Sequence, residues 1–261
     1  MLISQYIEIL KDLAPKNVVN NETTCDTVKS GDVNKEISRV AVSMFATPEV
    51  INQAAEWGAN FLIVHEPSFY EHMDINRNSF LAKEKTKLLE EKNLTVFRFH
   101  DYAHSMEPDL ICEGELKYIN LNGVFQKGKN WAVNRFVLKD EITAKELADH
   151  LEKNLSIKHI RIAGCTDKKG KNISCCFGTP GHIAEELAEN DFVLTGEVCE
   201  WQLGEIARDY AQFGYNKAIL VMGHIGSERA GMMLLAEKLE DLVPEIPVKY
   251  FECGEVYSYT H

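Results

Sequence analysis

A histidine and a glutamate directly follow a short apolar run in the first third of the chain. Residues 61–64 read Phe-Leu-Ile-Val, which is typical of a fully buried strand. Pro67 has no N–H to donate and restricts the backbone of Glu66, so the strand is expected to end at His65 and Glu66. Two potential metal ligands would thus lie at the carboxyl end of a buried strand, where open α/β sheets bind ligands. An acidic strand end with a surface histidine explains the same residues equally well.

Two further apolar runs end in the same kinds of side chain. His100 and His104 follow the run 94–99, and His224 and Glu228 follow the run 218–222. We expect Glu228 to lie in the first turn of a helix over 227–242 capped by Ser227, where the helix dipole favours a carboxylate. A place in the first helical turn would by itself explain an acidic residue at position 228, without any metal. Its spacing of four from His224 also allows both side chains to turn toward one point.

Imidazole and carboxylate groups together favour borderline first-row metals. Zn²⁺, Fe²⁺, Mn²⁺, Co²⁺ and Ni²⁺ accept such mixed ligands, whereas Ca²⁺ and Mg²⁺ prefer oxygen alone. The six candidates at the three strand ends exceed the three protein ligands that one open catalytic zinc usually has. They would fit two metal ions with a carboxylate bridging them, as in two-metal hydrolytic sites.

Short apolar strands alternate with amphipathic helices along almost the whole chain. This alternation predicts an α/β fold with mostly parallel or mixed sheets and right-handed connections. Segment 120–130 is rich in Asn, Gly and Lys and is the best boundary candidate. We therefore expect a first α/β domain over 1–125 with the first two histidine groups, and a second α/β half over 126–261 with the third. The C-terminal part of the second half could pack back on the first domain.

Local signals predict where several elements begin and end. Thr47 before Pro48, and Thr143 with Glu146 three residues later, are typical of helix N-termini. The helix expected over 79–92 should turn four apolar side chains inward: Phe80, Leu81, Leu88 and Leu89. The polar segment 21–35 is expected to form a loop.

Composition and charge exclude several classes of protein. The chain has 261 residues, 45% of them apolar, and a formal net charge of −12, which repels nucleic acid and anionic membranes. Seven cysteines, without a C-x-x-C pair, favour a reducing compartment over a disulfide framework. No run approaches the roughly 20 apolar residues of a membrane span, and no signal sequence is visible. We expect a cytoplasmic protein that does not bind membranes, with nucleic acid a disfavoured partner.

Four motifs, in this order, resemble those of the NIF-three-like (YbgI-like) family. They are His65-Glu66-Pro67, HDYAH at 100–104, Thr195-Gly196-Glu197 and GHIGSE at 223–228. Their order and spacing match across nearly the whole chain. Members of this family are also called type 2 GTP cyclohydrolase I. The resemblance implies a two-domain α/β fold, a dinuclear metal centre between the domains and a toroidal homohexamer.

The resemblance assigns ligand roles residue by residue. His65 matches the first of the family's paired histidines, whereas Glu66 stands where the second is usual. His104 stands where the family has a metal-binding aspartate. The predicted ligands are His65, Glu66, His104, His224 and Glu228, the last two matching the family without change. Histidine and carboxylate have thus exchanged at two positions, which keeps the number of ligands and leaves open whether Zn, Fe, Mn, Co or Ni is bound.

These residues lead to the hypothesis of a dinuclear metal protein with hydrolase-type chemistry. Glu197 and His100 are the candidate catalytic residues that would move protons. Glu197 could instead orient a metal-bound histidine or be a plain helix-start acid, and His100 could itself bind metal. The family name points to a nucleotide such as GTP, or a cyclic amide or amidine, as small-molecule substrate. His72 is expected on a surface loop, with a place in the site as the alternative.

The alternative function comes from a different class. A metal-binding regulatory or interaction protein without turnover would also fit the altered ligand set and the acidic surface. DNA binding ranks third, because a net charge of −12 opposes it.

Overall fold

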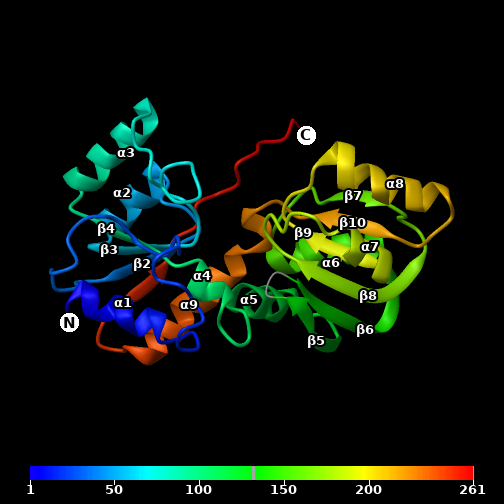
Figure 1. Ribbon diagram of the computed structural model, residues 1–261, viewed down its shortest axis with the longest axis horizontal. Coiled ribbons are helices and arrows are strands. Elements are labelled where there is room, and N and C mark those ends of the chain that lie inside the picture. Colours follow the sequence, from blue (N-terminus) through cyan, green and yellow to red (C-terminus); the bar gives the residue numbers. More distant parts are fainter. Residues whose placement is uncertain (131–132, 261) are drawn as a thin grey trace. The chain divides into compact units, whose positions relative to one another are not determined.

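The computed structural model describes residues 1–130 and 133–260, and the chain divides into two compact units. Unit 1 is Met1–Leu110 together with Gly231–His261, and unit 2 is Ile111–Ala230 (Figure 1). The chain therefore leaves unit 1 in helix α5 (Leu110–Ile119) and returns to it in helix α9 (Arg229–Leu242).

Unit 1 contains a five-stranded sheet in the order β1-β4-β3-β2-β11. Its strands are β1 (Val28–Ser30), β2 (Val40–Ser43), β3 (Phe61–Val64), β4 (Thr95–Arg98) and β11 (Val248–Tyr250). β1 pairs antiparallel with β4, and the other pairs are parallel. The helices are α1 (Ile3–Lys11), α2 (Pro48–Glu56), α3 (Phe80–Glu91), α4 (Asp101–His104) and most of α9. Strand β1 lies in segment 21–35, where a loop alone was expected.

Helices cover both faces of this sheet. Every residue of β2, β3 and β4 is buried, as the apolar runs predict. Leu62 and Val64 pack in one apolar cluster with side chains of α2 and α3. Phe61 points to the opposite face, where Tyr6 of α1 contacts it with ring centroids 6.0 Å apart.

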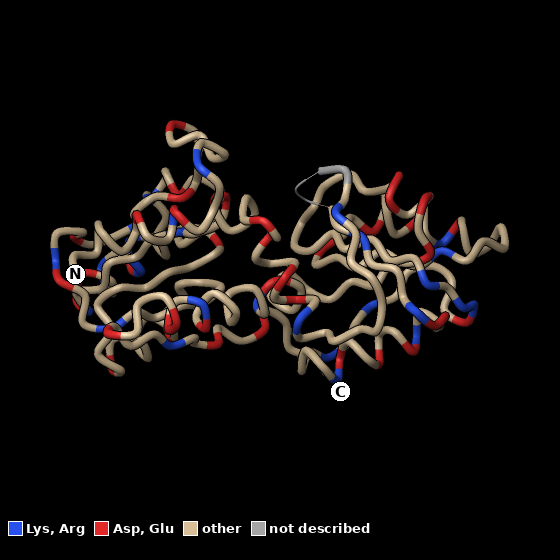
Figure 2. The backbone as a smooth tube through the Cα atoms, turned by 90° about the horizontal axis from the view of Figure 1, so that it is seen from below, with Lys and Arg blue, Asp and Glu red and all other residues tan. Residues whose placement is uncertain are grey.

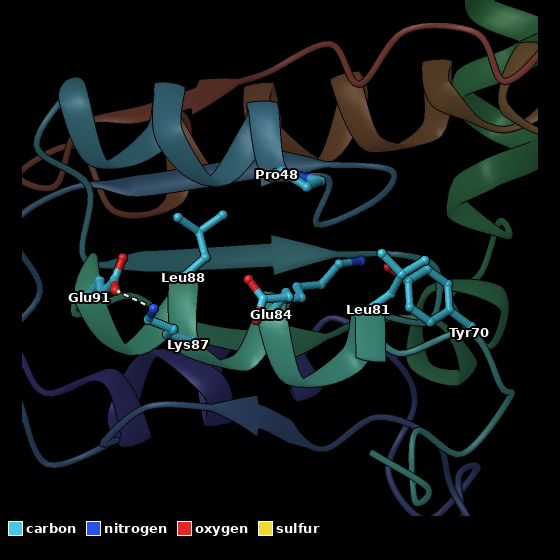
Figure 3. Close-up of a pocket in the computed structure, with 8 residues that line it drawn as sticks. Pro48, Tyr70, Leu81, Glu84, Lys87, Leu88 and Glu91 are labelled. Carbon is cyan, nitrogen blue, oxygen red and sulfur yellow. Dashed lines mark ion pairs between the residues drawn. The ribbon is translucent and has the colours of Figure 1, made fainter. Parts of the chain in front are cut away.

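Helix α3 packs on the sheet with only part of the face that was predicted. Phe80 and Leu81 are 75% and 59% exposed, so the prediction that they point inward was wrong. Leu89 is buried and Leu88 is partly buried, as predicted, and Ala82 is buried in the same apolar cluster. Leu81 and Leu88 line a pocket of about 290 Å³ between α3 and the start of α2, with Pro48 on its other side (Figure 3).

Unit 2 contains a six-stranded mixed sheet in the order β5-β6-β8-β9-β10-β7. Its strands are β5 (Gly123–Asn130), β6 (Val133–Thr143), β7 (Arg161–Gly164), β8 (Lys169–Cys176), β9 (Phe192–Thr195) and β10 (Ala218–Val221). β8, β9 and β10 are parallel, and the remaining pairs are antiparallel. Segment 120–130, predicted as a boundary from its composition, thus contains strand β5, since Asn, Gly and Lys are tolerated in an edge strand.

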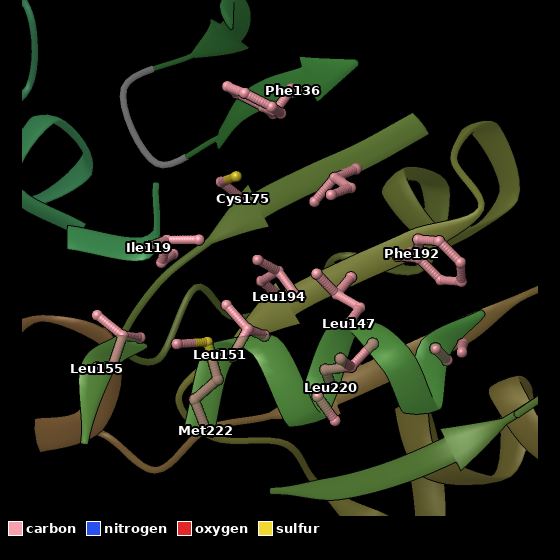
Figure 4. Close-up of a cluster of buried hydrophobic side chains, with 14 of the residues drawn as sticks. Ile119, Phe136, Leu147, Leu151, Leu155, Cys175, Phe192, Leu194, Leu220 and Met222 are labelled. Atoms are coloured by element: carbon pink, nitrogen blue, oxygen red, sulfur yellow. The ribbon is translucent and has the colours of Figure 1, made fainter. Parts of the chain in front are cut away.

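The core of unit 2 lies on both faces of its sheet. Helix α6 (Ala144–Leu155) covers one face, where Leu147 and Leu151 pack toward Leu194 and Leu220 (Figure 4). Helices α7 (Ala184–Glu189) and α8 (Glu205–Gln212) contribute to the apolar cluster on the other face. The capping box at Thr143 is confirmed, and so is the cap at Thr47.

Charged residues are spread over both units. Lys and Arg are interspersed with Asp and Glu along the backbone and form no continuous basic stripe among the described residues (Figure 2). Within the same residues, no helix has the length and apolar character needed to cross a bilayer. The predicted fold class, α/β with mixed sheets, is confirmed.

Candidate metal centre

Strand β3 delivers His65 and Glu66 to the carboxyl edge of the unit 1 sheet. The parallel register places Val64 beside Arg98, so the residues after β3 and after β4 emerge at the same edge. His65 is fully buried and Glu66 is 7% exposed. The backbone N–H groups of both residues donate to the carbonyl of Met44 after β2, at 3.2 and 3.0 Å. The surface-histidine interpretation of this strand end was wrong.

Three predicted histidines of unit 1 lie together at this edge. The ring centroids of His65 and His100 are 4.7 Å apart, and that of His104 lies 5.1 and 4.9 Å from them. One ring nitrogen from each lies within 4.8 Å of the others, as a shared metal ion requires. A carboxylate oxygen of Glu66 lies within 4.8 Å of a His65 nitrogen. This buried cluster could hold a metal ion.

Each of these rings is held through the same nitrogen. The pairs are His65 Nδ1 with the Phe99 carbonyl at 3.1 Å, His100 Nδ1 with Asp101 Oδ1 at 2.9 Å, and His104 Nδ1 with Asp109 Oδ2 at 2.9 Å. Because a carbonyl or carboxylate oxygen only accepts, Nδ1 must carry the proton in all three. Nε2 then carries the lone pair in each neutral ring. Metal-binding histidines are commonly oriented in this way.

Burial and charge tune two groups of the cluster. Burial lowers the pKa of His65 well below its usual value, and the neighbouring His100 and His104 rings, when protonated, lower that pKa further. His65 is therefore neutral at physiological pH, as a metal ligand must be. Burial alone would raise the pKa of Asp101, but hydrogen bonds from His100 and Thr24 hold it below its usual range. Asp101 thus remains an ionised acceptor for His100.

Asp26 fixes the start of the helix that carries two of the histidines. Its carboxylate accepts the backbone N–H groups of His100, Asp101 and Tyr102 at 2.8, 3.0 and 2.9 Å. Cys25 next to it donates its backbone N–H and its thiol to Asp101. Because these carboxylate oxygens already accept hydrogen bonds, we interpret the group as a support for His100 rather than a second metal site.

His72 lies closer to the cluster than a plain surface histidine would. Its side chain is exposed, as predicted, but its ring centroid is 5.9 Å from that of His100. The expectation of a surface loop and the alternative of a place beside the site therefore both describe this residue.

In unit 2 the three predicted residues also lie together. The ends of β9 and β10 are adjacent in parallel register, and they lead to Glu197 and His224. His224 Nδ1 is 2.8 Å from Glu197 Oε1, and its Nε2 is 3.2 Å from Glu228 Oε2. Thr179 Oγ1 is 3.2 Å from the same Nδ1. Glu228 is 3% exposed, which argues against a plain solvent-facing helix-start acid.

Close backbone contacts position Glu228. Gly178 has φ +67°, and a Cβ added there would lie 2.1 Å from Glu228 Oε1, so a larger residue would be strained and would displace the carboxylate. The prediction that Ser227 caps the last helix was wrong, because Ser227 lies in a short 3₁₀ turn (Ile225–Ser227) before α9. Its hydroxyl instead accepts the Gly178 N–H and donates to the His224 carbonyl, both at 3.0 Å.

Sequence reasoning missed the residues that hold the histidines. Asp26, Arg98 and Asp109 each contact a predicted ligand or the helix that carries it. Asp101 had a local signal, since it directly follows a histidine. Asp26 had none, because 74 residues separate it from His100.

The Duf34/NIF3 (NGG1p interacting factor 3) family model matches residues 1–254. The chain belongs to this family. A relative from Clostridium perfringens (strain 13 / Type A), named GTP cyclohydrolase 1 type 2 homolog, is 24% identical over 249 residues, 92% of each chain. A relative of the same name from Neisseria meningitidis serogroup A is 25% identical over 210 residues, 79% of this chain and 80% of the relative. The predicted family is confirmed.

Solved structures share the fold of this Duf34/NIF3 member. The protein ybgI superimposes with a TM-score of 0.82 at 18% identity, covering 98% of this chain and 100% of that one. Reduced HcgD from Methanocaldococcus jannaschii gives a TM-score of 0.75 at 17% identity, covering 96% and 97%. At these identities the likeness shows the fold alone.

Proposed function

We propose that this protein binds divalent metal ions and uses them for hydrolase-type chemistry. The observation that carries the proposal is the common anchoring of four histidines through Nδ1, three in unit 1 and one in unit 2. This arrangement leaves Nε2 of each ring as the nitrogen with the lone pair, which is the form that binds a metal ion. The residues therefore fit the metal that the family resemblance implies.

The proposed ligands form one set in each unit. His65, Glu66 and His104 bind from unit 1, with His100 as a further ligand, and His224 and Glu228 bind from unit 2. This mixture of nitrogen and oxygen donors suits Zn²⁺, Fe²⁺, Mn²⁺, Co²⁺ or Ni²⁺, and the number of donors suits two ions per chain. As in the family resemblance, we propose a homohexamer in the cytoplasm.

The chain's own residues have defined roles in this proposal. A bound divalent ion would activate water and polarise a carbonyl, imine-like or phosphoryl centre. Glu197 accepts the Nδ1 proton of His224 and so fixes the tautomer of that ring. The Glu197 side chain is 54% exposed, so it can also take a proton from a substrate. The relatives named GTP cyclohydrolase 1 type 2 homolog support a purine nucleotide or a cyclic amide or amidine as substrate.

Metal analysis of the purified protein tests this proposal. We expect about two divalent ions per chain, and loss of metal in His65→Ala and in a His224→Ala/Glu228→Ala double variant. His150→Ala is the matched control, because this histidine contacts the Ile119 carbonyl and Asn154 and belongs to neither ligand set. Fewer than one ion per chain in the wild type, unchanged in the double variant, would contradict metal binding.

Turnover separates the enzyme from a metal-binding regulator. The metal-loaded protein is screened against GTP, phosphoesters and cyclic amides, and hydrolysis that disappears in Glu66→Ala supports the enzyme. The regulatory alternative has its own observation, since Tyr70, Ile75, Phe80 and Leu81 are all exposed apolar side chains around the start of α3. Tight metal binding without turnover of any tested compound would favour that alternative.

A further inference from the structure

Arg98 is a buried cation at the edge of the unit 1 sheet that holds the histidines. It is the last residue of β4 and is 1% exposed, and it is among the largest fully buried side chains. A buried guanidinium is costly unless its donors are used. The partners of Arg98 therefore indicate what the residue is for.

The guanidinium reaches three points around the candidate ligands. Nε donates to the His65 carbonyl at 2.8 Å, and Nη1 donates to the His72 carbonyl. Nη2 lies 3.4 Å from Glu66 Oε2. Arg98 thus contacts the backbone of one proposed ligand, the side chain of another, and the loop that follows both.

We propose that Arg98 is the positioning residue that directs the Glu66 carboxylate as a metal ligand. The inference rests on the proposed metal binding. The guanidinium engages Oε2 of Glu66, the side chain that lies beside His65 in the candidate ligand group. The planar fork of Arg98 fixes the direction of the carboxylate, because two of its nitrogens are anchored on backbone carbonyls that cannot turn.

The same contact sets the charge of the ligand group. Imidazole rings are neutral ligands, so the Glu66 carboxylate brings negative charge to the unit 1 set. The fixed positive charge of Arg98 draws electron density from that carboxylate and weakens it as a donor. A weaker oxygen donor favours a metal that prefers nitrogen ligands over one that prefers carboxylate ligands. Position 98 therefore tunes metal choice as well as affinity.

Lysine at position 98 separates positioning from charge. A lysine ammonium can pair with Glu66, but it is a point charge without the fork that also reaches the His65 and His72 carbonyls. We expect Arg98→Lys to keep metal binding with roughly tenfold lower Co²⁺ affinity and a changed visible spectrum of bound Co²⁺. Arg98→Met should weaken Co²⁺ binding further.

The matched control is Lys29→Met. Lys29 is a second buried cation of unit 1, 2% exposed, which pairs with Asp74 at 3.6 Å and donates to the Met73 carbonyl at 3.4 Å. It resembles Arg98 in burial and in contacting the same loop, but its partners Asp74 and Met73 are not proposed ligands. We expect Lys29→Met to lower Tm while the Co²⁺ spectrum and affinity stay those of the wild type.

A double-mutant cycle completes the test. Glu66→Gln should weaken Co²⁺ binding clearly in the wild type and much less in the Arg98→Met background, because the carboxylate is no longer directed there. Additive effects, or a wild-type Co²⁺ spectrum in Arg98→Lys, would overturn the role of Arg98 while leaving metal binding intact. Absence of Co²⁺ binding by the wild type would overturn the proposed function and this inference together.

Discussion

His224 lies between the carboxylates of Glu197 and Glu228, with Nδ1 2.8 Å from the first and Nε2 3.2 Å from the second. Two carboxylates around one imidazole favour a positive charge at that place, either a proton on the ring or a metal ion beside it. Because Glu197 accepts from Nδ1, a metal ion would meet Nε2 and Glu228 together.

Replacement of Glu197 tests its effect on His224. In Glu197→Gln the amide can accept from or donate to Nδ1, so the tautomer of His224 is no longer fixed. We expect metal affinity to fall about tenfold, the lower end of the range for lost ligand-orienting partners. Isothermal titration of the metal-free protein measures it, and Glu205→Gln on exposed α8 serves as the control. Unchanged affinity in Glu197→Gln would show that Glu197 does not orient His224.

Replacement of Gly178 tests whether its close approach to Glu228 affects metal binding. Gly178→Ala would place a methyl group 2.1 Å from Glu228 Oε1, so the carboxylate must move and metal content should fall. Gly181→Ala is a close control, because Gly181 also has a positive φ of +76° but its added Cβ would have nothing within 4 Å. Both variants carry backbone strain of about 1 kcal/mol or more. Equal metal loss in the two variants would assign the effect to strain rather than to Glu228.

Replacement of Asp26 tests whether this residue positions the histidines of unit 1. Asp26→Asn keeps an acceptor for two of the three N–H groups but turns an NH₂ group toward the third. We expect the free energy of unfolding to fall by about 1–3 kcal/mol in urea titrations. Metal affinity should also fall, because the start of α4 positions His100 and His104. A loss of stability with unchanged metal affinity would limit Asp26 to a structural role.

Glu115 gives a pH dependence with a defined sign. It is fully buried, Oε2 has no hydrogen-bond partner among the described residues, and burial raises its pKa to about 8 from 4.5. Between about pH 4.5 and pH 8 the folded protein holds a proton that the unfolded chain has lost. Stability from this group is therefore full at low pH and is lost as pH rises through that window, by a few kcal/mol.

Glu115→Gln should remove this decline. Its amide keeps an acceptor for the Ala230 N–H, which Glu115 Oε1 accepts at 2.9 Å. We expect the variant to match the wild type near pH 5 and to be more stable at pH 8–9, measured by urea unfolding across the range. A wild-type slope that persists in the variant would show that other groups cause it.

The sequence could predict the ligands better than their supports. His65 and His100 follow neighbouring parallel strands of unit 1, and His224 follows a parallel strand of unit 2. Parallel strands bring the residues that follow them to one edge of their own sheet. Arg98 and Asp26 carry no such signal, because their partners are distant in sequence and depend on how the sheet is assembled. The apolar pattern could not predict fully which face of α3 is buried, because the exposed Phe80 and Leu81 are as apolar as the residues that are buried. The order of the four motifs predicted the family. The residue types of the site do not identify a substrate, because the same ligands serve many hydrolytic reactions.

The position of strand β11 in the sequence affects the order in which the two sheets can form during synthesis. It pairs with β2, yet about 200 residues of chain, including all of unit 2, are synthesised between them. On the ribosome, unit 2 can complete its sheet while β2 still has an open edge, because β11 is synthesised after unit 2. A chain that lacks Val248–Tyr250 would therefore leave the edge of β2 unpaired, which favours pairing with other chains.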